Sequence, residues 1–379
     1  MRRIFLIISV LLSVSAQAIT VGADQPSAYL PLLADKQVAM VVNQTSRTQK
    51  QHLVDSLLAE SVSIIRVMAP EHGFRGEQGA GEHVEDARDE KTGLPIVSLY
   101  GATKKPTPQM LADVDVLIFD IQDVGTRFYT YISTLHYVME AAAENQVAVI
   151  VLDRPNPNGR FVDGPIRQPG FASFVGLDPI PVLHGMTVGE LARMIKSEGW
   201  ISHSEALDLT VIPVQDYSRD MPWSLPVPPS PNLPNDTAVR LYPSLCFFEA
   251  TAVSVGRGTN LPFQLIGHDT VALGTLSVTP QSRPQAPQPK LQNTMLQARD
   301  LRSSPVEGLD LSLLIDTYRQ FKQAGEPFFT HPDFMDKLAG TDSLRKAIEA
   351  GLSEAQIKAS WAPQLEQFKA LRAPYLLYE

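Results

Sequence analysis

The sequence has 379 residues, a formal charge of −9, a hydrophobic fraction of 44% and a single cysteine. An acidic chain without a basic run is unsuited to binding nucleic acid through its phosphates, so we predict no nucleic-acid partner. The length is sufficient to bury a large core and indicates two domains. Cys246 cannot form an intrachain disulfide, and its neighbours Leu245 and Phe247 predict a small core residue rather than a nucleophile.

The first eighteen residues have the pattern of a cleavable export signal. Arg2 and Arg3 are followed by the apolar run 4–14 and by the small-x-small sequence 16–18. We therefore predict cleavage after Ala18 and a periplasmic or secreted protein. Without the two arginines, 30 basic residues face 41 acidic ones and the formal charge is −11. No later apolar run reaches about 18 residues, so no membrane span is expected after cleavage.

Strand and helix signals alternate through the first half of the chain. This alternation predicts a parallel sheet covered by helices. The predicted strands are residues 38–42, 61–68, 95–100, 114–119, 147–152 and 207–214, and the predicted helices are 51–60, 130–144 and 187–199. Thr187 and Glu190 form a capping box at the start of the last helix.

Polar, chemically capable residues follow four of these strands. They make up the segments Asn43–Ser46, Pro70–Gly76, Asp120–Arg127 and Asp153–Gly159. In an open α/β sheet, ligands bind at the carboxyl ends of the strands. The four segments therefore predict one shared site.

The segment 222–234 is rich in proline, which excludes a helix and disfavours a central strand. It is either a linker or a rigid wall that crosses a cleft. We place the domain boundary there, with an N-terminal domain at 19–224 and a C-terminal α+β domain at 225–379. In the second domain the pattern predicts strands at 250–255 and 270–278, a polar loop at 281–288, and helices at 311–324 and 341–369.

Glu71 is the leading candidate for a general acid, because it lies beside Phe74 and several glycines in a loop that follows a strand. Glycoside hydrolysis usually needs a second carboxyl group on the other side of the bond. The candidates for that role are Asp120, Asp123, Asp153 and Glu249.

A second group of candidates is cationic. Guanidinium groups bind carboxylates in a fork geometry, so arginines near glycine-containing loops indicate an anionic ligand. The alternative is that each arginine pairs with a neighbouring aspartate. These arginines are Arg75, Arg127, Arg154 and Arg257.

Other common chemistries lack their motifs. The segment Gly256–Thr259 does not have the Walker spacing, no Gly-x-Gly-x-x-Gly follows the first strand, and no Gly-x-Ser-x-Gly elbow is present. The histidines at 72, 83, 184 and 268 do not have the short paired spacing of a zinc site. We therefore predict no metal and no cofactor, and keep metal-dependent hydrolysis as an alternative.

The chain resembles the NamZ family of exo-β-N-acetylmuramidases over nearly its whole length. The matching segments are 43–46, 70–76, 120–131, 153–157, 184–190, 229–232, 242–243 and 248–259. The resemblance implies a Rossmann-like N-terminal domain and a smaller C-terminal domain with the active site in the cleft between them. It also implies removal of N-acetylmuramic acid from the non-reducing end of peptidoglycan fragments. One departure is Ala250-Thr251-Ala252, where the family usually has Gly-Thr after the glutamate.

Combining the resemblance with the residue patterns gives a hypothesis for the site. Glu71 is the general acid/base, Asp120 or Asp123 is the preferred second carboxylate, and Glu249 is the alternative. The lactyl carboxylate of the expected substrate, a MurNAc-GlcNAc saccharide, would account for arginines in the cleft of an acidic protein. The expected substrate-binding residues are Asn43, His72, Arg75, Gln122, Arg127, Tyr129, Tyr131, Asp153, Asn156, His184, Asn232 and Arg257.

Two alternatives come from other functional classes. A non-catalytic periplasmic protein could capture muropeptides in a two-domain cleft, and such a protein would tolerate Glu71→Gln. A metal-dependent amidase or esterase could act on the same polymer, and chelators would inhibit it. The sequence carries no signal for an oligomeric state or for the stereochemical course of hydrolysis.

Overall fold

The computed structural model describes residues 19–75 and 87–379. The predicted export signal and His83 lie outside the described residues. The N-terminal domain is built on a seven-stranded sheet in the order β3-β4-β2-β1-β5-β6-β7. Its neighbouring strands pair in parallel, except for the short antiparallel pair of β3 with β4. The strands are β1 Val38–Val42, β2 Ile64–Ala69, β3 Ala87–Arg88, β4 Pro95–Ser98, β5 Val116–Asp120, β6 Ala148–Leu152 and β7 Leu209–Ile212.

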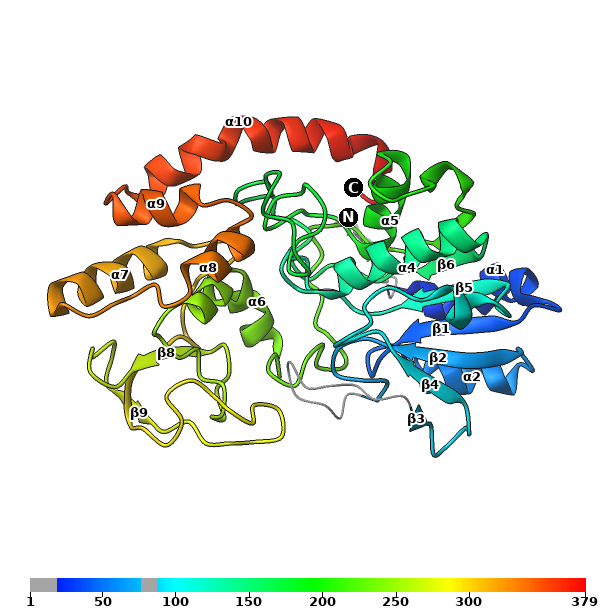
Figure 1. The fold of residues 1–379 in the computed structure, drawn as a ribbon, viewed down its shortest axis with the longest axis horizontal. Coiled ribbons are helices and arrows are strands. Elements are labelled where there is room, and N and C mark those ends of the chain that lie inside the picture. The colour runs from blue at the N-terminus through cyan, green and yellow to red at the C-terminus, as the bar shows by residue number, and fades with distance from the viewer. Residues whose placement is uncertain (1–18, 76–86) are drawn as a thin grey trace, which may run out of the picture.

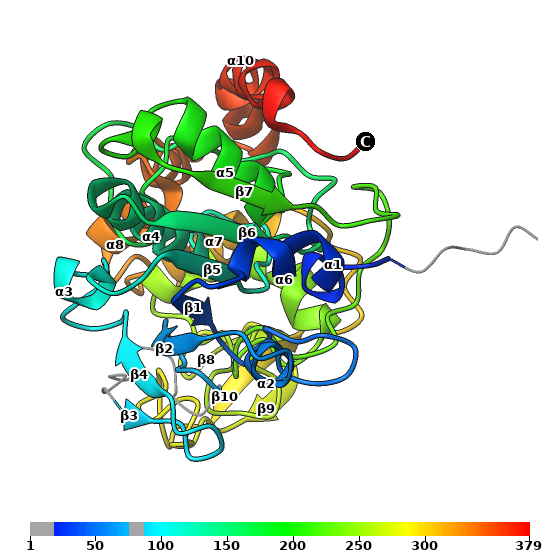
Figure 2. The ribbon, with the colours of Figure 1, turned by 90° about the vertical axis from the view of Figure 1, so that its right-hand side faces the viewer.

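The central strands are apolar on both sides because helices cover both faces of the sheet. Every residue of β1 is buried: Ala39 and Val41 face one apolar cluster, and Val38, Met40 and Val42 face the other. The first cluster includes α4 (Tyr131–Asn145), and the second includes α2 (Leu53–Ala59). In Figure 2, α4 lies on one side of the stacked strands, and α1 (Pro26–Tyr29) and α2 lie on the other. The predicted α/β fold class is thus confirmed.

The C-terminal domain contains a small antiparallel sheet of β8 (Leu265–His268), β10 (Leu296–Asp300) and β9 (Leu276–Val278), in that order. The helices of this domain lie above it in Figure 1. The remaining α-helices of the chain are α3 Pro108–Leu111, α5 Val188–Ser197, α6 Asp236–Leu245, α7 Ser312–Ala324, α8 Pro332–Ala339, α9 Ser343–Glu349 and α10 Glu354–Arg372, and a 3₁₀ turn, η4, spans Cys246–Ala250.

The sequence patterns were less reliable in this domain. The predicted strand 250–255 is wrong, because this segment forms only isolated bridges at Thr251 and Ser254. The predicted helix 341–369 is two helices, which separate at Gly351, where φ is +81°. The patterns missed β8, β10, α6 and α8. Cys246 is buried as expected, and burial raises the pKa of its thiol to about 12.

Helix α10 crosses from the C-terminal domain back to the N-terminal domain near α5 (Figure 1). Near its start, Lys358 Nζ lies 2.8 Å from Asp163 Oδ2, and Trp361 Nε1 donates to Asp163 Oδ1 at 3.1 Å. At its end, Arg372 Nη1 donates to the carbonyl of His184 at 2.9 Å. The helix therefore braces the two domains against each other. Across the described ranges, no helix combines the length and apolar character needed to cross a bilayer.

Candidate active site

The loops that follow the parallel strands are tied together at one edge of the sheet. The main-chain N–H of Gln122, after β5, donates to Thr45 Oγ1, after β1, at 3.0 Å. The amide group of Gln122 donates to the carbonyl of Pro155, after β6, at 2.8 Å. Ser46 Oγ also bonds to the carbonyl of Asp120. Three of the polar segments that the sequence singled out, 43–46, 120–127 and 153–159, are thus joined in one layer of loops at the strand ends, as expected for an open α/β sheet.

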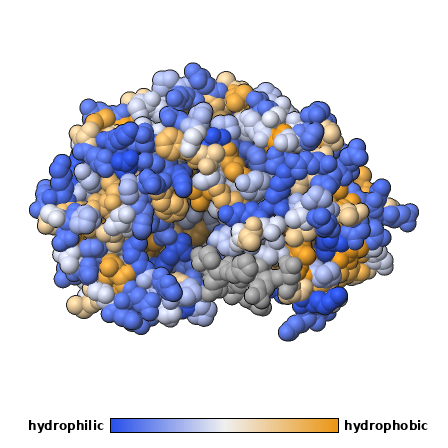
Figure 3. Space-filling view, viewed as in Figure 1, coloured by the Kyte–Doolittle hydropathy of each residue, from blue (hydrophilic) through white to orange (hydrophobic). Residues whose placement is uncertain are grey.

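Two cavities open beside this layer, and Glu71 and Arg257 line both of them. The smaller cavity, of about 70 Å³, has mainly aromatic walls; its other lining residues are His72, Phe128, Tyr129, Thr130, Tyr131, Ser230, Asn232, Leu233, Tyr242 and Phe263. The larger cavity, of about 770 Å³, is otherwise lined from the C-terminal domain by Glu249, Val253, Ser254, Val255, residues 285–290 and Phe334. Figure 3 shows this face of the molecule hollowed between the two domains. The predicted cleft between the domains is therefore present.

Glu71 presents a fixed carboxylate to this cleft. Strand β2 ends at Ala69, and the chain then turns sharply through His72 and Gly73, whose φ values are +71° and +74°. A left-handed conformation at a residue other than glycine is typical of turns that position functional groups. Tyr100 Oη donates to Glu71 Oε1 at 3.0 Å, and Thr130 Oγ1 donates to Glu71 Oε2 at 3.1 Å. Each carboxylate oxygen thus has one hydroxyl donor.

Beneath Glu71 lies a packed group of tyrosines. The rings of Tyr129 and Tyr131 meet edge to face with centroids 5.0 Å apart, and Tyr242 lies 5.9 Å from Tyr129 in the same geometry. Tyr131 Oη donates to the main-chain carbonyl of Glu71 at 3.2 Å. Burial raises the pKa of Tyr129 and Tyr131, so both hydroxyls remain neutral donors. Tyr129 and Tyr131, which the sequence analysis expects to bind substrate, line the smaller cavity.

The proline-rich segment forms another part of this wall. Tyr129 Oη donates to the carbonyl of Pro229 at 2.7 Å, and Ser230 Oγ lies 3.1 Å from His72 Nε2. Asn232 follows in the same segment and is only 1% exposed. Of the two interpretations of residues 222–234, the rigid wall fits the structure.

The opposite side of the cleft carries charged residues from the C-terminal domain. Arg257 Nε lies 3.2 Å from both carboxylate oxygens of Glu249. The Arg257 guanidinium also stacks over Phe263, with Cζ 4.9 Å from the ring centre. The ammonium group of Lys290 bonds to four main-chain carbonyls, those of Phe248, Glu249, Thr251 and Val253. Lys290 thus stabilises the turn η4 that carries Glu249.

The two carboxylates preferred from sequence as the second catalytic group do not reach the cleft. Asp120 is fully buried and receives Arg154 Nε at 2.6 Å and Nη2 at 2.9 Å. Asp123 is 4% exposed, and its Oδ2 accepts the N–H of Gly125 at 2.6 Å. Burial raises the pKa of Asp123 to about 7. Neither residue is among the described lining of either cavity: Asp120 ends β5, Asp123 follows in the loop, and both are buried. Glu249 is the candidate that shares a cavity with Glu71.

Several residues predicted as ligand contacts bond to other groups of the protein. Arg127 is fully buried and donates to the carbonyls of Pro165, Ile180 and Leu338. Arg75 forms a two-bond pair with Asp89 at 2.8 Å. The other predicted contacts that are buried and take part in hydrogen bonds within the protein are Asn43, Gln122, Asp153, Asn156 and His184. The charge of a residue and its position after a strand therefore do not distinguish a residue that contacts a ligand from a buried residue that stabilises the loops.

The sequence analysis missed other residues that bond to Glu71 or line the cavities. Tyr100 follows β4 and obeys the same strand-end rule that identified Glu71, so that rule could have found it. Thr130 lies within the motif 120–131 but was not selected. The patterns gave no signal for Ser230, Tyr242, Phe263 or Phe334, which tertiary packing brings to the cavities.

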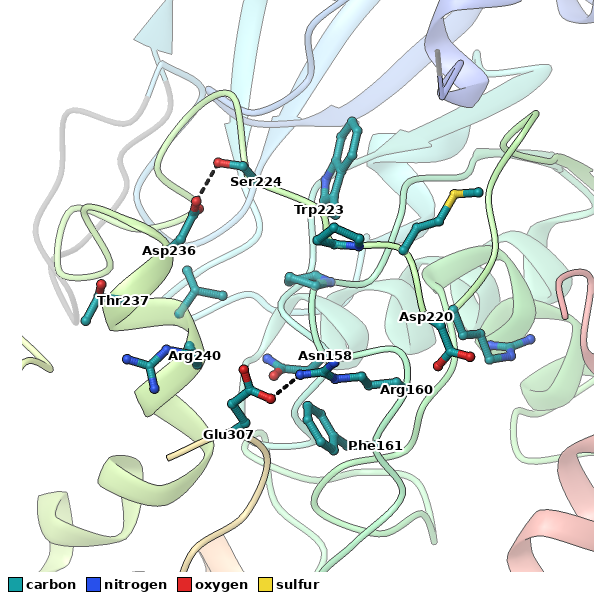
Figure 4. Close-up of a pocket in the computed structure, with 15 residues that line it drawn as sticks. Asn158, Arg160, Phe161, Asp220, Trp223, Ser224, Asp236, Thr237, Arg240 and Glu307 are labelled. Atoms are coloured by element: carbon teal, nitrogen blue, oxygen red, sulfur yellow. Dashed lines mark hydrogen bonds and ion pairs between the residues drawn. The ribbon is translucent and has the colours of Figure 1, made fainter. Parts of the chain in front are cut away.

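A further cavity, of about 460 Å³, does not include Glu71 or any other predicted site residue in its described lining (Figure 4). Trp223, Arg240 and the ion pair of Arg160 with Glu307 contribute to its walls. Within the described ranges, no three His, Cys, Asp or Glu side chains are grouped so as to hold a metal ion.

Comparison with known proteins identifies relatives along the whole chain. The family model described as exo-β-N-acetylmuramidase NamZ, N-terminal, matches residues 38–237, and its C-terminal counterpart matches residues 240–378. A peptidoglycan β-N-acetylmuramidase NamZ from Bacillus subtilis (strain 168) is 41% identical, covering 92% of this chain and 89% of the relative. A crystal structure of a DUF1343 family protein from Bacteroides fragilis has a TM-score of 0.85 at 42% identity, covering 96% of this chain and 99% of its own. A second such structure from that organism has a TM-score of 0.81 at 28% identity, covering 95% and 99%.

Proposed function

The chain belongs to the exo-β-N-acetylmuramidase NamZ family, and from this we propose that Glu71 is the general acid/base of an exo-acting glycoside hydrolase. The observation that carries the assignment is the position of Glu71. Its carboxylate lines both cavities of the cleft between the domains and is held by Tyr100 and Thr130. In glycoside hydrolysis such a group protonates the oxygen of the leaving sugar.

We assign Glu249 as the second carboxylate. It lines the larger cavity opposite Glu71 and comes from the other domain, so a glycosidic bond bound between the domains would have one carboxyl group on each side. The ion pair with Arg257 and the support of η4 by Lys290 fix its position. Two carboxyl groups on opposite sides of the bond meet the general requirement for this reaction.

The proposed substrate is a peptidoglycan fragment such as MurNAc-GlcNAc, from which the terminal N-acetylmuramic acid is released. The larger cavity, of about 770 Å³, falls within the usual range of roughly 300–1,000 Å³ for small-molecule sites. We also propose that the protein acts outside the cytoplasm, because residues 1–18 have the composition of an export signal and cell-wall fragments occur there.

The proposal is tested by measuring release of N-acetylmuramic acid from MurNAc-GlcNAc by the wild type and by Glu71→Gln, both with EDTA present. Loss of a general acid lowers the rate by a factor of about 10²–10⁴. We expect that loss in kcat with binding of the disaccharide retained, and no loss in the exposed control Glu60→Gln. A folded wild type that binds the disaccharide without cleaving it would support the binding-protein alternative. Activity that EDTA abolishes would support the metal-dependent one.

The role of Glu249 is tested with aryl glycosides of N-acetylmuramic acid that differ in leaving group. Glu71→Gln should be least impaired with the most acidic leaving group, which needs no proton. Glu249→Gln should be impaired equally with all leaving groups. Full activity of Glu249→Gln would exclude it as the second carboxylate.

A further inference from the structure

Arg257 differs from the other three arginines that the sequence assigned to an anionic ligand. Arg75 is paired with Asp89, Arg154 with Asp120, and Arg127 with main-chain carbonyls. Only Arg257, among these four, lines the two cavities that contain Glu71. An anionic substrate in the cleft would therefore meet this guanidinium.

The orientation of Arg257 leaves the two Nη atoms of its guanidinium group available to a ligand. Both contacts with Glu249 use Nε, and the ring of Phe263 supports one face of the guanidinium. The two Nη atoms make no hydrogen bond to any residue in the described part of the chain. The Arg257 side chain is 25% exposed, so solvent and ligands can reach it. Two parallel N–H donors on one planar group match the two oxygens of a carboxylate.

Asn232 provides a second, independent observation in the smaller cavity. Its Nδ2 donates to the carbonyl of Gln285 at 2.7 Å, which assigns Oδ1 to the other side of the amide. This Oδ1 is buried and has no partner among the described residues, although the residue is only 1% exposed. Leaving a buried acceptor without a donor is unfavourable, so such an atom indicates a site that a ligand donor completes.

We propose that Arg257 and Asn232 together recognise the two substituents that distinguish N-acetylmuramic acid from plain glucose. The Nη atoms of Arg257 bind the carboxylate of the 3-O-lactyl group, and Asn232 Oδ1 accepts the N–H of the 2-acetamido group. This inference rests on the proposed function and adds the residues that determine its specificity.

The arrangement of the cavities matches the arrangement of the sugar. The acetamido and lactyl groups occupy adjacent ring carbons, and Arg257 lies where the small and large cavities meet. The small cavity, of about 70 Å³, is lined by Phe128, Tyr242 and Phe263, which suit an acetyl methyl group. The larger cavity accommodates the lactyl group and the remainder of the saccharide.

The test pairs changes in the enzyme with changes in the substrate. The substrates are an aryl β-glycoside of N-acetylmuramic acid and the neutral amide formed at its lactyl carboxyl group. Since a charge-assisted hydrogen bond contributes about 1.5–3 kcal/mol, Arg257→Gln should lower kcat/KM for the acid by roughly 10- to 100-fold. Because Arg257 also holds Glu249, the same variant should lower kcat/KM for the amide as well, but by clearly less than for the acid. Arg257→Lys should recover part of the loss on the acid because it keeps the charge but not the fork.

Asn232→Asp replaces the amide donor to Gln285 by an anion, whereas Asn232→Leu removes both polar atoms. Asn232→Leu should raise KM for N-acetylated substrates more than Asn232→Asp, which keeps an acceptor oxygen, and should cause little loss when hydroxyl replaces the acetamido group. Arg302→Gln, an exposed change in the same domain, is the charge control. Equal losses on acid and amide would overturn the role of Arg257. Equal losses with and without the acetamido group would overturn the role of Asn232.

The same comparison can be made without turnover. Calorimetry can measure the binding of free N-acetylmuramic acid and of its lactyl amide. We expect the wild type to bind the acid more tightly than the amide, and Arg257→Gln to lose this preference. If the wild type binds the acid selectively but releases no sugar, the proposed function fails and this inference stands. If it releases sugar but treats acid and amide alike, the inference fails and the function stands.

Discussion

Arg127 Nη2 donates to the carbonyl of Leu338 at 2.9 Å, and this bond joins a loop of the N-terminal domain to the last turn of α8 in the C-terminal domain. The Nη1 atom of the same guanidinium reaches the carbonyls of Pro165 and Ile180. Burial lowers the pKa of Arg127 to about 9, which still leaves it charged at neutral pH. A cation surrounded by carbonyl dipoles thus fixes the relative position of the domains on one side of the cleft.

Arg127→Met should therefore destabilise the protein by about 3–5 kcal/mol, because it leaves three carbonyl groups without their donor. The measurement is the free energy of unfolding from denaturant titration. The exposed Arg160→Met is the matched control and should change stability by less than about 0.5 kcal/mol. A stable Arg127→Met variant that has lost only activity would show instead that Arg127 acts on substrate.

The buried pair of Asp120 and Arg154 predicts strong coupling. Arg154→Gln leaves the Asp120 carboxylate buried without its cation, and such a change costs about 3–5 kcal/mol. The double variant Asp120→Asn/Arg154→Gln should recover part of that loss, because it removes the unpaired charge. Thermal unfolding of the two single variants and the double variant measures the coupling. Strictly additive losses would contradict it.

Asp123 predicts a pH dependence of stability. Burial raises the pKa of its carboxyl group from 3.8 to about 7 in the folded state, so between these values the folded state binds more protons than the unfolded state. Its contribution to stability is complete below pH 3.8 and falls as the pH rises to about 7. The total is on the order of 4 kcal/mol, at 1.36 kcal/mol per pKa unit.

Asp123→Asn keeps an acceptor for Gly125 and cannot ionise. Between pH 4 and 7, which is about the interval between the unfolded and folded pKa values of Asp123, the melting temperature of Asp123→Asn should therefore fall less than that of the wild type. The exposed control Asp35→Asn should follow the wild-type curve. Parallel curves for wild type and Asp123→Asn would show that this carboxyl group does not titrate in the interval.

The hydroxyl donors to Glu71 predict effects on catalysis. Tyr100→Phe removes the donor to Oε1, and a hydrogen bond of this kind contributes about 1 kcal/mol, or roughly fivefold in rate. We expect kcat to fall by at least that factor, with a smaller change in KM. Steady-state kinetics on a MurNAc glycoside measures this, and Tyr137→Phe, which removes a hydroxyl from α4 outside the two cavities, is the control. An unchanged kcat would mean that Tyr100 does not position the carboxylate.

The N-terminal sheet was predictable because its strands carry a strong local signal. Val38–Val42 and Ala148–Leu152 are continuous apolar runs, and the capping box of Thr187 and Glu190 marks the start of α5. In the C-terminal domain the sequence patterns of helices and strands are weaker. Helix α6 contains Pro243, and β9 has only three residues, so local patterns were insufficient to predict the elements of this domain.

The candidate site was predictable only in part, for a related reason. The strand-end rule located Glu71 and Tyr129, but it could not separate residues that face the cleft from those one layer below. Asp120 and Arg127 have the same residue types as a catalytic acid and a ligand-binding arginine, yet each is fully buried with its own partners. That Glu249 and Glu71 line one cavity depends on how the two domains pack, which no local pattern contains.

The contacts of α10 with both domains also affect how substrate enters the cleft. Lys358 and Arg372 anchor the helix at both ends, and one apolar cluster continues from Phe119 in β5 to Phe321 in α7. A molecule joined in this way cannot open and shut around a ligand as a hinged receptor does. Solution scattering should therefore give the same radius of gyration with and without saccharide, and the sugar would have to enter a groove that already has its final width.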